Sequence, residues 1–156
     1  PVNGRYTKRQ RAVYDAVLRV KTAATKLLRP GTMLVEYHKE VGKLMEKELL
    51  ALKLIDKTDI KNQDPAWPAY KKYFMHGTSH FIGLDVHDVG LWNEPIKEGM
   101  CFTVEPGIYI PKENLGIRIE NDILVTKKGQ DDLFKEIPQE AEAIEEMMNS
   151  GKKGKK

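Results

Sequence analysis

The first half of the chain has the hydrophobic spacing of two amphipathic helices. Apolar residues recur every three or four positions across residues 13–27, and the preceding TKRQ at residues 7–10 has the form of a capping box. The Arg29-Pro30-Gly31 turn ends this pattern. A second helix is expected over residues 35–52. Two helices joined by a short Pro-Gly turn are typical of a layer that covers a sheet.

The pattern changes to β character after residue 73. Before that point, Asp64-Pro65 and Trp67-Pro68 favour extended or turning backbone over residues 53–73. Short apolar and β-branched runs separated by Gly and Pro then continue to residue 125, and residues 102–104 and 117–120 read as strands. Residues 138–148 predict a short helix with Pro at its start. Helices followed by strands and a last helix indicate an α+β fold.

Composition excludes several classes of protein. With 156 residues, 40% apolar and 31% charged, the chain fits one soluble globular domain, and no apolar run is long enough to span a membrane. The net charge is +3, but the terminal GKKGKK contributes four positive charges, so the rest of the chain carries a net charge of −1. We therefore expect no nucleic-acid binding. The single Cys101 cannot form an internal disulfide, which makes a reducing cytoplasm the default location.

Three of the four histidines lie within the segment HGTSHFIGLDVHD at residues 76–88. His76 and His80 share a face on either a strand or a helix, whereas His87 joins them only if Gly83 allows a bend. Imidazole can bind a metal or move a proton near neutral pH. From spacing alone, the alternative is that these histidines satisfy turns and core hydrogen bonds.

Two carboxylates form the second candidate feature. If Lys112 and Glu113 mark the tip of an antiparallel hairpin, Glu105 faces Glu120 directly, with Cβ atoms about 5 Å apart. Two like charges so placed are destabilising unless a cation lies between them. Arg118 shares the face of Glu120 and could be an exposed partner of carboxylates at a solvated sheet edge. The combination with the histidines instead favours a site for a divalent cation such as Mn²⁺.

Three segments in order resemble the signatures of Xaa-Pro aminopeptidases, members of the pita-bread metallopeptidase family. They are HGTSHFIGLDVHD, EGMCFTVEPGIYI and GIRIENDILVT, and PVNGRYTKRQRAVYDAVL is similar to the start of that family's first long helix. The resemblance implies a partial pita-bread fold, with helices packed on a curved antiparallel sheet. Residues 1–148 would be the C-terminal part of the catalytic domain, and residues 149–156 a disordered Gly/Lys tail.

The resemblance also implies a reaction and a metal centre. Such enzymes cleave the bond between an N-terminal residue and a following proline, by attack of a hydroxide that bridges two divalent metal ions. Mn is the expected metal, with Co, Zn or Fe as alternatives. His80, Glu105 and Glu120 are the implied metal ligands, and Glu105 also handles the proton of the attacking water.

The resemblance also implies residues that contact the substrate. His76 and His87 would be catalytic and substrate-binding, holding the scissile carbonyl and stabilising the tetrahedral intermediate. Arg118 belongs to the same substrate-binding set and would orient a metal-binding carboxylate. Tyr109 resembles a tyrosine that lines the site. His38 matches no functional position, and we expect it on the surface of the second helix.

In the family, two further Asp ligands precede the PVNGRY-like segment. We therefore expect this chain alone to bind metal weakly, to be inactive, and to need the N-terminal part of the same protein as its partner. Peptides with proline at the second position are the expected substrates, and a homo-oligomer is expected. The alternative is a non-catalytic pita-bread-like binding or scaffold module. Such modules usually lose metal-binding or substrate histidines, whereas this chain keeps them all.

Overall fold

The computed structural model describes residues 1–150 of the chain. Its elements are α1 (Lys8–Leu27), α2 (Leu34–Ala51), α3 (Lys57–Lys61), η1 (Ala69–Lys72), β1 (Cys101–Val104), β2 (Gly107–Ile110), η2 (Pro111–Glu113), β3 (Leu115–Arg118), β4 (Asn121–Thr126), β5 (Gly129–Asp132) and α4 (Ala141–Ser150). The α+β class is confirmed. Across these 150 residues, no helix combines the length and the apolar character needed to cross a membrane.

The two predicted N-terminal helices are present close to their expected bounds. The Thr7 hydroxyl accepts a hydrogen bond from the Gln10 N–H, and the Gln10 side chain accepts one from the Thr7 N–H, which confirms the capping box. The α1 helix ends at Leu27, shortly before Pro30. The α2 helix begins at Leu34 and buries one apolar face along its length.

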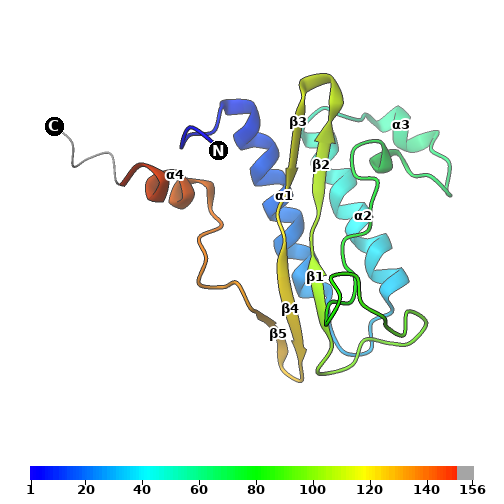
Figure 1. Cartoon of the computed structure of the whole chain (residues 1–156). Coiled ribbons are helices and arrows are strands. Elements are labelled where there is room, and N and C mark those ends of the chain that lie inside the picture. The colour runs from blue at the N-terminus through cyan, green and yellow to red at the C-terminus, as the bar shows by residue number, and fades with distance from the viewer. Residues whose placement is uncertain (151–156) are drawn as a thin grey trace.

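The strands form one long antiparallel hairpin with an interruption in the middle. Val104 pairs with Asn121 on one side of the interruption, and Gly107 pairs with Arg118 on the other. The two pairs belong to the same register, and the short helix η2 forms the tip. The predicted hairpin alignment, which places Glu105 opposite Glu120, is therefore confirmed. A further strand, β5, pairs with β4 at the other end (Figure 1).

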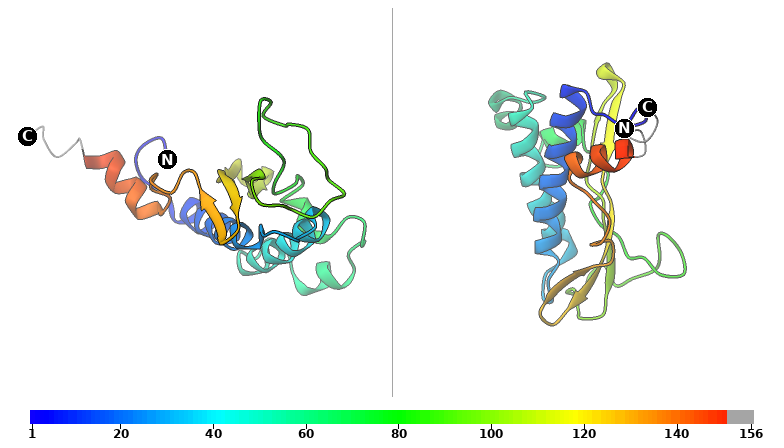
Figure 2. Two further views of the ribbon diagram at one scale, coloured as in Figure 1. Left: turned by 90° about the horizontal axis from the view of Figure 1, so that it is seen from below. Right: turned by 90° about the vertical axis from the view of Figure 1, so that its left-hand side faces the viewer.

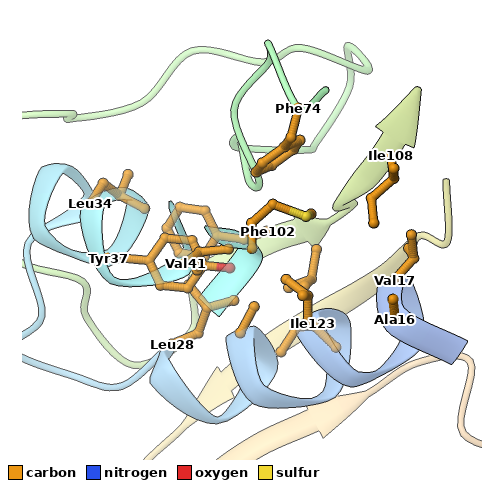
Figure 3. Close-up of a cluster of buried hydrophobic side chains, with 14 of the residues drawn as sticks. Ala16, Val17, Leu28, Leu34, Tyr37, Val41, Phe74, Phe102, Ile108 and Ile123 are labelled. Carbon is orange, nitrogen blue, oxygen red and sulfur yellow. The ribbon is translucent and has the colours of Figure 1, made fainter. Parts of the chain in front are cut away.

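The α1 and α2 helices cover one face of these strands, and the green loop that precedes β1 projects from the opposite face (Figure 2). Phe102 and Ile123 of the sheet pack toward Val17 of α1 and Tyr37 of α2 in a fully buried core (Figure 3). Burying one such apolar side chain contributes about 1.5–3 kcal/mol. The core therefore fixes the helix layer against one side of the hairpin and leaves the other side available for polar residues.

Two predictions about chain segments need correction. The last helix begins at Ala141 instead of residue 138, because Gln139 is held outside it by hydrogen bonds from Tyr14 Oη to its carbonyl and from Lys21 Nζ to its side chain. The same helix continues to Ser150, so Asn149 does not belong to a tail; its amide donates to the Gly4 carbonyl. The rest of the expected tail, residues 151–156, lies outside the described residues.

The histidine-rich region also differs from expectation. Residues 76–100 run mainly as loop, with a single bridge between Phe81 and Phe102 in place of a regular strand.

Candidate metal centre

The segment that carries His80 lies beside the end of β1 and is held there by its backbone. The Thr103 N–H donates to the His80 carbonyl at 3.1 Å, and the Glu105 N–H donates to the Thr78 carbonyl at 2.8 Å. These bonds bring the side chain of His80 next to that of Glu105. Glu120 arrives from the opposite strand through the hairpin register.

His80, Glu105 and Glu120 converge on one point. One ligand atom from each lies within 4.8 Å of the other two, and His80 Nε2 is 3.2 Å from Glu105 Oε1. Nδ1 of His80 lies 2.8 Å from the Phe81 carbonyl, which can only accept, so Nδ1 carries a proton and Nε2 is the nitrogen that a metal ion would take as its ligand. Two carboxylates facing each other repel, and a divalent cation would relieve that repulsion.

Arg118 lies beside both carboxylates. Its Nη1 is 3.6 Å from Glu105 Oε2, and its Nε is 3.7 Å from Glu120 Oε2. The Arg118 side chain is half exposed, while the Glu105 side chain is only 12% exposed. The arginine thus supplies one positive charge to a pair of negative ones from the solvent side.

His87 reaches the site through the expected bend. The Asp88 N–H donates to the Phe81 carbonyl, which folds the loop back, and a Cβ at Gly83 would overlap the Asp88 carboxylate. The His87 and His80 rings meet edge to face with centroids 4.2 Å apart. His87 is exposed, so its ring is free to contact a bound molecule.

His76 is paired with Tyr109 of β2. Its Nδ1 is 2.7 Å from the Gly77 carbonyl and its Nε2 is 2.8 Å from Tyr109 Oη. Because the carbonyl requires a proton on Nδ1, Nε2 of the neutral ring accepts a hydrogen bond from the Tyr109 hydroxyl. His76 and Tyr109 therefore act as one hydrogen-bonded unit.

The prediction for His38 was wrong. This residue is partly buried, and its Nδ1 accepts a hydrogen bond from the Thr78 N–H at 3.3 Å. Its neighbour Tyr37 is buried and hydrogen-bonded to Ser79. Sequence periodicity could not reveal these contacts, because they join residues about 40 positions apart. The one signal in the sequence was a tyrosine on the buried face of a helix, because a buried hydroxyl requires a polar partner.

The donor set fits a divalent metal ion. Two carboxylates and one imidazole nitrogen are the ligand types that suit Mn²⁺, Fe²⁺ and Zn²⁺. His80 also has the expected orientation for a ligand, since its other ring nitrogen donates to a backbone carbonyl. Three protein donors leave coordination positions for other groups.

Comparison with known proteins gives a consistent result. Residues 2–127 match metallopeptidase family M24. The chain is 39% identical to Xaa-Pro aminopeptidase from Escherichia coli K12 over 98% of its length, and 36% identical to human Xaa-Pro aminopeptidase 3 over 94%. It covers only 37% and 31% of these relatives, about a third of their length.

The structural comparison agrees. Aminopeptidase P from E. coli with the inhibitor Pro-Leu superposes with a TM-score of 0.85 at 38% identity, over 98% of this chain and 37% of that one. A zinc-substituted form of the E. coli enzyme in complex with product gives a TM-score of 0.84 at 38% identity, over 96% and 36% of the two chains. The fold is thus part of the pita-bread fold, and the chain belongs to metallopeptidase family M24.

Proposed function

We propose that this chain is the metal-binding C-terminal part of an Xaa-Pro aminopeptidase, which removes an N-terminal residue that precedes proline. The observation that carries this proposal is the convergence of His80, Glu105 and Glu120 within 4.8 Å. Family membership and the similarity to Xaa-Pro aminopeptidases support the same reaction class. A scaffold module would have no need of an imidazole and two carboxylates that converge on one point.

His80, Glu105 and Glu120 would hold the metal, and we propose that a segment outside the described residues supplies the remaining donors. Bound divalent ions supply a water of lowered pKa and polarise the scissile carbonyl. Manganese is the expected metal, because the site has more oxygen donors than nitrogen donors. The cytoplasmic location and the homo-oligomer remain predictions.

The protein's own residues would divide the other tasks. The Glu105 side chain is less exposed than that of Glu120 and lies against His80. Glu105 is therefore placed to accept the proton of the attacking water. His87, on the exposed side of His80, would donate a hydrogen bond to the carbonyl oxygen. The hydrogen-bonded unit formed by His76 and Tyr109 would also contact the substrate. Arg118 would keep the two carboxylates in place.

The proposal is tested by peptide hydrolysis with the full natural protein that contains this chain. With manganese present, it should cleave peptides with proline at the second position and leave matched alanine peptides intact. Glu105→Gln should lower kcat by about 10²-fold or more, because the group that accepts the proton is lost. Glu98→Gln, the same change at an exposed position, serves as the control.

Residues 1–156 alone should show negligible hydrolysis and weak Mn²⁺ binding by calorimetry, because three donors do not complete a metal site. Absence of Xaa-Pro cleavage by the full natural protein, in the presence of Mn²⁺, Co²⁺, Zn²⁺ or Fe²⁺, would reject the proposed function.

A further inference from the structure

Two residues in the first part of α2 hold the short segment between His76 and His80. Tyr37 Oη and Ser79 Oγ are hydrogen-bonded at 2.8 Å, and His38 Nδ1 accepts from the Thr78 N–H at 3.3 Å. We call Tyr37 and His38 the α2 clamp. Tyr37, Thr78 and Ser79 are each less than 5% exposed, so these polar groups have no access to bulk water as an alternative partner.

The direction of one bond fixes the state of His38. A backbone N–H can only donate, so Nδ1 of His38 must be unprotonated and the ring neutral, with its proton on Nε2. Burial lowers the pKa of His38; a hydrogen bond with the Ser79 backbone opposes this, and the nearby Lys71 adds to the lowering, so that on balance the neutral ring is favoured. The ring also packs against Gly77, where a Cβ would lie 3.4 Å from His38 Cε1.

The clamp is connected to the metal centre through the two neighbouring residues Thr78 and Ser79. Thr78 donates its N–H to His38 on α2 and accepts the Glu105 N–H at its carbonyl, at 2.8 Å. Ser79, held by Tyr37, directly precedes His80. A displacement of this segment would therefore move the backbones of both His80 and Glu105.

We propose that Tyr37 and His38 are positioning residues, which hold Thr78 and Ser79 so that His80 and Glu105 stay at metal-binding separation. Hydrogen bonds suit this task because they are directional, whereas apolar packing allows a segment to slide. Metal sites lose affinity when ligands shift by about 0.5 Å, and loss of a residue that orients a ligand commonly costs about 10–100-fold in affinity or activity. This inference rests on the proposed function only for its effect on catalysis.

The test compares two substitutions of nearly equal size. His38→Leu removes the acceptor for the Thr78 N–H, whereas His38→Asn places a carbonyl oxygen where Nδ1 lies. Tyr37→Phe removes only the hydroxyl that contacts Ser79. Mn²⁺ affinity and steady-state kinetics are measured on the full natural protein, and hydrogen exchange of the Thr78 amide is measured by NMR on the 156-residue chain.

His38→Leu should weaken Mn²⁺ binding by about tenfold or more, lower kcat at saturating metal with little change in KM, and expose the Thr78 amide to exchange. His38→Asn should restore all three. A folded His38→Leu protein with wild-type Mn²⁺ affinity would overturn the inference. If His38→Leu does not fold, Tyr37→Phe decides: it should weaken Mn²⁺ binding, and unchanged affinity would overturn the inference.

These outcomes are separable from those of the proposed function. A wild-type protein that binds Mn²⁺ but cleaves no Xaa-Pro peptide would reject the function and leave the clamp testable by affinity and exchange. An active wild-type protein whose folded clamp variants match it in affinity and kcat would reject only the clamp.

Discussion

Arg118 offers a direct test of the electrostatics of the site in the absence of metal. It lies 3.6 Å from a Glu105 oxygen and 3.7 Å from a Glu120 oxygen, and its side chain is 51% exposed. Replacing it with Met keeps much of the aliphatic length and removes the charge. The two carboxylates then face each other without the positive charge beside them.

The expected loss of stability in Arg118→Met follows from the two distances and from the exposure of the side chain. At these separations, each pair of unit charges is worth about 1 kcal/mol in a water-like dielectric, and exposed pairs are measured at about 0.2–1 kcal/mol. Since Arg118 makes two such pairs, we expect Arg118→Met to lower the free energy of unfolding by about 0.4–2 kcal/mol at low salt. In 1 M NaCl the Debye length falls to about 3 Å, so most of this loss should disappear.

Urea unfolding of the 156-residue chain at pH 7, with a chelator present, measures the effect. Lys112→Met is the control, because it removes an exposed positive charge at the hairpin tip, and we expect it to change stability by less than about 0.5 kcal/mol. Adding Glu120→Gln to Arg118→Met should recover about half of the loss. A loss that is equal at low and high salt, or that Glu120→Gln leaves unchanged, would refute the electrostatic account.

Two further predictions concern stability away from the metal ligands. Burial opposes the charged form of Asp132, but hydrogen bonds from the Asn121 amide and the buried Lys21 lower its pKa on balance. The carboxylate therefore stabilises the fold at pH values above its unfolded pKa of about 3.9, and this contribution is lost as the pH falls below that value. Asp132→Asn should lower the free energy of unfolding by about 1–3 kcal/mol at pH 7. In urea unfolding at several pH values, the variant should also lack this part of the acid dependence. Gly42→Ala would place a methyl group 2.6 Å from Tyr70 Cζ. The midpoint temperature of thermal unfolding should therefore fall by several degrees, despite the better helix propensity of Ala. Adding Tyr70→Leu removes the clashing ring and should reverse that fall.

Local features of the sequence were sufficient for several parts of the structure. The capping box at Thr7 depends only on residues 7–10, and the turn at Pro30 depends on proline's missing N–H, so the bounds of α1 could be predicted. The hairpin register depends on where the chain turns, and this alone placed Glu105 opposite Glu120. These interactions are determined by neighbours in the chain or by one tight turn.

Only the tertiary structure decided which polar groups meet across the layers. Gln139 stays outside α4 because it contacts Tyr14 and Lys21 on α1, more than 100 positions away. His38 carries a polar contact instead of lying on the surface, because α2 docks against the histidine-rich loop at that point. Such contacts follow from how helices, sheet and loop pack together, and hydrophobic periodicity specifies which face is buried without specifying which residue it meets.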